Sequence, residues 1–98
     1  MREIDKMIEI RDNLNDVEKR SFDEALNNIG DTFKAMVYSV KDYILNAEEK
    51  KIQLETAKTA LNTVKQLADK AGIEMPDFDT DEKVKAYSLK YGMEIVNN

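Results

Sequence analysis

The segment from Leu26 to Ala71 decides the fold, and it reads LNNIGDTFKAMVYSVKDYILNAEEKKIQLETAKTALNTVKQLADKA. Two series of positions repeat along it every seven residues, and every member except Lys50 is apolar or aromatic. The series are Leu26, Phe33, Val40, Ala47, Leu54, Leu61 and Ala68, and Ile29, Met36, Tyr43, Lys50, Ala57, Val64 and Ala71. Steps of three and four residues return to the same side of an α-helix, which has 3.6 residues per turn. The segment is therefore predicted to be helical, with one apolar stripe.

Two arrangements of this segment are compatible with the stripe, and they differ at Asn46. In the first, the chain reverses near Asn46, because Asn46 followed by Glu49 resembles the start of a helix. In the second, one helix spans 32–71; it would be about 60 Å long and would need a second copy to cover it. Lys50 favours the reversal, since it would be a buried cation in a continuous coiled coil but faces solvent in the first turn of a new helix.

The other helices are predicted from apolar spacing and from residues that start or end helices. Together with the central segment they give this set of ranges: 2–13, 16–29, 33–47, 48–71 and 81–91. The predicted fold is all-α, an antiparallel helical bundle of four to five helices with a heptad-spaced core, in a single domain over 1–98. The runner-up is a long-helix homodimer.

Several helix ends have specific sequence signals. Asn15 followed by Glu18 resembles a capping box, and Gly72 is predicted to end the helix before it in the left-handed conformation. Either Thr80 or Asp79 is expected to cap the last helix, and Gly92 to end it. Gly30 is interpreted as a kink or short break. For 93–98 a frayed tail and a packed segment both remain open.

Composition limits the classes of partner. The chain has 42 % hydrophobic and 36 % charged residues and a net charge of −5, typical of a folded acidic protein. A negative net charge argues against a general nucleic-acid binder and against docking on an anionic membrane. No apolar run reaches the ~18–20 residues of a membrane span, and the first ten residues lack a signal-peptide core. We therefore expect a cytoplasmic protein; the abundance of Lys, Ile, Asn and Glu suggests a bacterial source.

Residues that commonly carry catalysis are missing from the sequence. There is no histidine and no cysteine, and three glycines are too few for a phosphate-binding loop. The acidic segment 77–82 begins like a calcium loop, but Glu82 and Ser88 occupy the positions where glycine and glutamate are needed. We predict a non-enzyme with no cofactor and no metal, and interpret the acidic segment as helix capping. An enzyme or ligand carrier with a buried lysine is a weaker alternative.

Three groups of residues are candidates for partner contact. Tyr87 and Tyr91 are four residues apart and would form either a recognition ridge or, as we favour, a packing contact of the last helix. A second stripe consists of Tyr38, Leu45 and Ile52. A candidate basic strip consists of Lys51, Lys58 and Lys65, although a solvated helix flank is the favoured interpretation of such lysines.

Taken together, these features predict a non-enzymatic protein-binding module, comparable to small acidic helical inhibitors, immunity proteins or adaptors. It would act through apolar and tyrosine-bearing helix faces. The alternative is a structural, self-associating subunit that forms a homodimer through the heptad stripe. The expected partner is another protein or a second copy of the chain, and neither nucleic acid nor a membrane.

Overall fold

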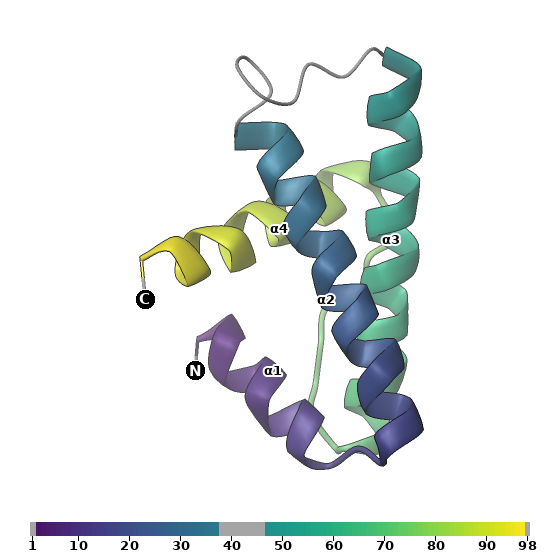
Figure 1. The fold of residues 1–98 in the computed structure, drawn as a ribbon, viewed down its shortest axis with the longest axis vertical. Coiled ribbons are helices and arrows are strands. Elements are labelled where there is room, and N and C mark those ends of the chain that lie inside the picture. The colour runs from purple at the N-terminus through teal and green to yellow at the C-terminus, as the bar shows by residue number, and fades with distance from the viewer. Residues whose placement is uncertain (1, 38–46, 98) are drawn as a thin grey trace.

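Four α-helices make up the fold in a computed structural model that describes residues 2–37 and 47–97. They are α1 (Glu3–Asp12), α2 (Asp16–Val37), α3 (Ala47–Lys70) and α4 (Asp81–Val96), and no strand occurs in the described ranges (Figure 1). The all-α prediction is confirmed, and the four helices pack together. None of the described helices is long and apolar enough to cross a membrane.

The helices α2 and α3 lie side by side in opposite directions (Figure 1). Near one end of the pair, Gln53 Nε2 donates to Thr32 Oγ1 at 3.0 Å. Near the other, Lys70 Nζ donates to Glu18 Oε2 at 2.7 Å. The chain direction therefore reverses between the end of α2 and the start of α3. The alternative of one continuous helix is not what the structure contains, since the molecule's longest dimension is 38 Å.

The predicted turning point at Asn46 lies outside the described residues, as does most of the predicted helix 33–47. Of its described residues, 33–37 form the last turns of α2 and Ala47 begins α3. Lys50 is exposed in the first turns of α3. The sequence-based preference for a reversal assumed this solvent-facing position for Lys50.

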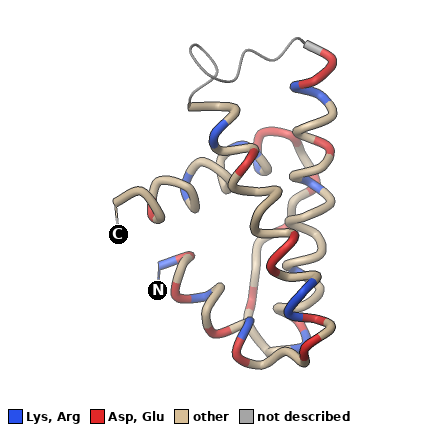
Figure 2. The backbone as a smooth tube through the Cα atoms, viewed as in Figure 1, with Lys and Arg blue, Asp and Glu red and all other residues tan. Residues whose placement is uncertain are grey.

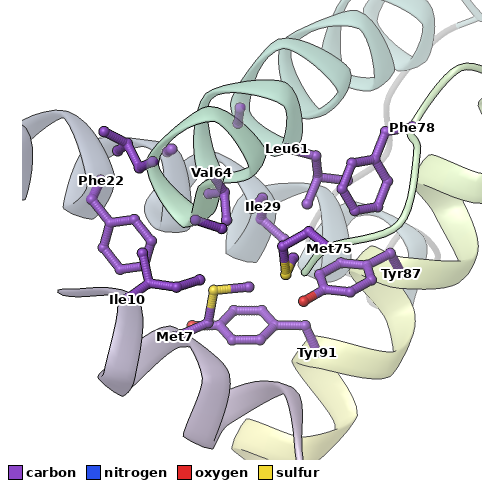
Figure 3. Packing of buried hydrophobic residues seen from close by; sticks show 14 of the residues in the cluster. Met7, Ile10, Phe22, Ile29, Leu61, Val64, Met75, Phe78, Tyr87 and Tyr91 are labelled. Atoms are coloured by element: carbon purple, nitrogen blue, oxygen red, sulfur yellow. The ribbon is translucent and has the colours of Figure 1, made fainter. Parts of the chain in front are cut away.

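The core lies between the α2–α3 pair and the two shorter helices (Figure 3). It also includes Met75 and Phe78 from the connection between α3 and α4. Where the heptad positions are described with their side chains, all except Lys50 are buried or half-buried. The core members from the helices and the α1–α2 turn are Met7, Ile10, Leu14, Phe22, Ala25, Ile29, Ala57, Ala60, Leu61, Val64, Leu67, Ala68, Val84, Tyr87 and Tyr91.

Three predicted helix ends are confirmed by their hydrogen bonds. The Asn15 amide donates to Glu18 Oε1 at 3.1 Å while the Glu18 amide donates to Asn15 Oδ1 at 2.9 Å, a reciprocal capping box. Gly72 has φ +73°, and the Ile73 amide donates to the carbonyl of Ala68 at 2.9 Å, as in a Schellman motif. At α4, Thr80 rather than Asp79 is the cap, its hydroxyl accepting from the Lys83 amide at 3.3 Å.

The predicted helix end at Gly92 and the predicted break at Gly30 were wrong, whereas a kink at Gly30 stays a prediction. The helix α2 continues through Gly30, and α4 continues through Gly92 to Val96, so 93–96 are helical rather than frayed. A glycine inside a helix costs roughly 1 kcal/mol relative to alanine, which packing can outweigh. At Gly92 the packing reason is visible, because an added Cβ would lie 2.1 Å from the Phe33 ring.

Candidate protein-binding face

The solvent-facing side of α4 is apolar along three turns. Ala86, Leu89, Met93 and Val96 follow one another at helical spacing, and we call these four residues the α4 stripe. Leu89, Met93 and Val96 are 43 %, 42 % and 58 % exposed. The opposite side of α4 is also apolar and is buried, through Val84, Tyr87 and Tyr91. A helix that is hydrophobic on both sides is normally covered on both sides, and α4 is covered on one.

The position of α4 is fixed at its crossing with α2 (Figure 1). A Cβ added to Gly92 would lie 2.1, 2.2 and 2.6 Å from three atoms of the Phe33 ring. Only glycine allows the two helices to approach this closely. At the start of α4, the rings of Phe78 and Tyr87 meet edge to face, with centroids 5.1 Å apart and planes at 72°.

The C-terminal half of α4 is attached to the start of α1. The Ile4 amide donates to Glu94 Oε1 at 3.1 Å, whereas the N-cap residue Arg2 makes no side-chain cap. A carboxylate from α4 thus occupies the N-terminus of α1, where its charge also complements the helix dipole. The buried carboxylate of Glu3 lies 3.5 Å from Lys6 Nζ and 3.7 Å from Lys90 Nζ. These contacts hold the stripe on a defined backbone.

Tyr87 and Tyr91 lie in the core and do not form an exposed ridge. Each is 7 % exposed, and Figure 3 shows both rings among the buried side chains, with Met7 and Met75 nearby. Burial raises the pKa of both phenols, and the charge of Glu3 raises that of Tyr87 further. The Tyr87 hydroxyl and the Ser88 hydroxyl have no hydrogen-bond partner within the described ranges. The packing interpretation is the arrangement found, because the inward side of α4 carries both rings.

The second predicted stripe is not assembled by the described residues. Ile52 is exposed on α3, and Tyr38 and Leu45 lie outside the described ranges. Their common role in partner contact stays a prediction.

Two lysines of the predicted basic strip contact the acidic connection that follows α3. Lys65 forms an ion pair with Asp77, and Lys58 Nζ donates to the carbonyl of Asp79 at 3.5 Å. Lys51 is exposed. The strip is therefore partly neutralised within the chain, and its contacts position the connection against α3.

Lysines border the α4 stripe on both sides. Lys83, Lys85 and Lys90 are the charged residues between 83 and 93, and no carboxylate occurs in that interval of a chain with net charge −5 (Figure 2). Lys83 Nζ is 2.7 Å from Asp79, and Lys90 lies near Glu3. Lys85 is exposed and has no ion pair or hydrogen bond with another described residue.

Two shallow depressions lined by described residues adjoin α4. One, of about 400 Å³, lies beside Ala86 and is lined by Pro76, Asp77, Phe78, Lys83, Ala86, Tyr87 and Lys90. The other, of about 610 Å³, lies between α2 and α4 and is lined by Asp23, Leu26, Asn27, Gly30, Asp31, Lys34, Tyr91 and Ile95. The exposed apolar surface of α4 is thus continuous with a depression that could accept a side chain.

Metal-ligating groups and buried lysines would each give the described residues a chemical role. Within them, no group of three or more carboxylates is placed to hold a metal ion, and no lysine is buried. The α4 stripe itself consists of alkyl and thioether side chains, which cannot transfer protons.

The α4 stripe was not predicted from the sequence, for an identifiable reason. Interpreting Gly92 as the end of the last helix separated Leu89 from Met93 and Val96. Their spacing of four and three residues was the available signal, and it becomes a single face only if the helix continues.

Comparisons with protein-family models, curated proteins and solved structures give no match to this chain. Its function is therefore inferred from the contacts and exposure of its own residues.

Proposed function

We propose that this chain is a non-enzymatic protein-binding module of the small acidic helical inhibitor, immunity-protein or adaptor type, and that the α4 stripe is its contact face. The observation that carries the proposal is the exposure of Leu89, Met93 and Val96 side by side on a helix that is held in place. Adjacent exposed apolar side chains lose unfavourable contact with water when a partner covers them.

The attachment of α4 to the rest of the molecule supports a role in binding, because a fixed helix presents its exposed face in one arrangement, whereas a loose surface helix does not. Its start contacts the core through Tyr87, its centre contacts Phe33 through Gly92, and its end holds α1 through Glu94. A partner would meet a preformed face, and little conformational entropy would be lost on binding. A cytoplasmic location and a bacterial source remain predictions from the sequence.

Photo-crosslinking tests the proposal even though the partner is unidentified. A photoreactive phenylalanine derivative placed at Leu89 is expected to give a crosslinked protein adduct of defined mass when the full chain is irradiated in its native cells. The same group at Val17, which is 73 % exposed on α2, is the matched control. Adducts that are absent at position 89, or identical at both positions, would contradict the proposal.

Self-association is the second candidate function, because the four residues of the α4 stripe can pair with the same four residues of a second copy. In an antiparallel pair of α4 helices, Leu89 would oppose Met93 and Ala86 would oppose Val96 of the other copy. The heptad stripe is less available for a homodimer, because most of its described positions are covered within the chain.

The solution mass separates the two candidate functions. We expect light scattering to give a mass near 11.3 kDa over a wide concentration range, because the Lys90 side chains of the two copies would repel one another in an antiparallel pair of α4 helices. A mass that rises toward twice this value, and that falls back in Leu89→Glu, would favour self-association instead.

A further inference from the structure

The shape of the α4 stripe matches one kind of protein segment. From Ala86 to Val96 the helix rises about 15 Å, or roughly three turns. A straight apolar line of this length on a helix is complementary to the apolar side of a second helix, whose side chains enter the grooves beside the line. The depression beside Ala86 provides a place for one larger side chain at that end.

The charges beside the stripe indicate what the partner helix carries. At about 100° per residue, Lys85 lies on one side of the stripe, and Lys83 and Lys90 lie on the other. Glu94 also lies on that second side, where its carboxylate accepts from the Ile4 amide of α1. A helix laid along the stripe places its own flanking residues next to these ammonium groups. Carboxylates there would be attracted, and lysines or arginines would be repelled. The unpaired Lys85 is the most available of the three.

A second copy and a lipid surface fit these charges less well. In an antiparallel pair of α4 helices, equivalent flanks meet, so Lys90 of one copy would lie close to Lys90 of the other. An anionic bilayer is an extended surface that would attract the lysines but would also meet the exposed Glu82, which lies on the line of the stripe about one turn before Ala86. A helix that covers only Ala86 to Val96 ends before Glu82.

We infer that the partner segment is an amphipathic helix with an apolar face about three turns long and with acidic residues on both flanks. This inference rests on the proposed function, and it adds the chemistry of the partner. The juxtaposition that carries it is the exposed stripe between lysines on both sides of α4.

Selection from a library of displayed random peptides, each of about 14 residues, tests the inference. The full wild-type chain serves as bait and the Leu89→Glu chain as counter-selection, after circular dichroism has established that the variant melts like the wild type. We expect enriched peptides with apolar residues at helical spacing and with Asp or Glu on both flanks. Met93→Glu is the second variant, to be used as counter-selection if Leu89→Glu fails to fold.

Charge reversal gives the quantitative part of the test. Lys85→Glu is expected to weaken binding of a selected acidic peptide by about threefold at low salt and to reduce the salt dependence of its affinity. Val17→Glu, a charge added to an exposed apolar residue outside α4, is expected to leave the affinity unchanged.

The outcomes separate the inference from the proposed function. Enriched peptides that require Leu89 but lack acidic flanks would overturn the inference alone. An absence of Leu89-dependent peptides would overturn the inference and count against the proposed function as well. Leu89-dependent binding to phosphatidylserine vesicles, or a Leu89-dependent dimer, would overturn the inference in favour of a lipid surface or a second copy.

Discussion

Gly92→Ala is expected to lower the free energy of unfolding by about 2–3 kcal/mol, near the upper range for overpacking. The added Cβ would lie 2.1–2.6 Å from three atoms of the Phe33 ring, so α4 or the ring must move. Both neighbours are held, since Phe33 is buried on α2 and α4 is attached at both ends. Urea unfolding monitored by circular dichroism measures the change.

Gly30→Ala is the matched control for this substitution. Gly30 is also inside a helix, but nothing lies within 4 Å of an added Cβ, so alanine is expected to raise stability by up to about 1 kcal/mol. The double variant Gly92→Ala with Phe33→Leu is expected to lose less stability than the sum of the single variants. If Gly92→Ala unfolds at the wild-type urea concentration, the close crossing of α2 and α4 is wrong.

Alkaline pH is expected to destabilise the chain through its buried tyrosines. The pKa of Tyr87 is raised from 10.0, by burial first and then by the nearby charge of Glu3; that of Tyr91 is raised by burial and by Glu94. Above about pH 10 the unfolded chain loses a phenolic proton that the folded chain keeps. The free energy of unfolding therefore falls as the pH rises above this value. The fall is roughly 1.4 kcal/mol per pH unit for each such tyrosine until the pKa of the folded state is reached.

Tyr87→Phe isolates this effect, because lysines lose their charge in the same pH range. The quantity to measure is the difference in unfolding free energy between wild type and Tyr87→Phe at several pH values from about 8 to 11. At the lower end we expect little loss, or a gain, since the Tyr87 hydroxyl is buried without a hydrogen-bond partner in the described structure. At the upper end the variant should become relatively more stable. Parallel curves would contradict the buried, neutral state of Tyr87.

Local sequence signals predicted the helix starts and the left-handed end of α3. The Asn15–Glu18 box and the Thr80 cap act within one turn, and Gly72 acts through its own φ angle, so a few neighbouring residues contain the necessary information. The all-α class followed from apolar spacing. The antiparallel order of α2 and α3 was favoured by one residue, Lys50.

Features that depend on distant contacts could not be predicted in this way. A glycine that follows a segment with helical spacing usually indicates a helix end, but the role of Gly92 is set by its contact with Phe33, far away in the sequence. Tyr87 and Tyr91 have the spacing of an exposed ridge as well as of a buried pair, and only the position of α4 on the core distinguishes the two. The candidate binding face was missed for the same reason, since it exists only when α4 continues to Val96.

The contact between Glu94 and the Ile4 amide also bears on the order in which the molecule is assembled during synthesis. The ribosome releases α1 first, yet the carboxylate that caps it is made near the end of the described chain. A helix of ten residues is marginal in water by itself. The cap on the first turn of α1 is therefore available only after α4 has been made.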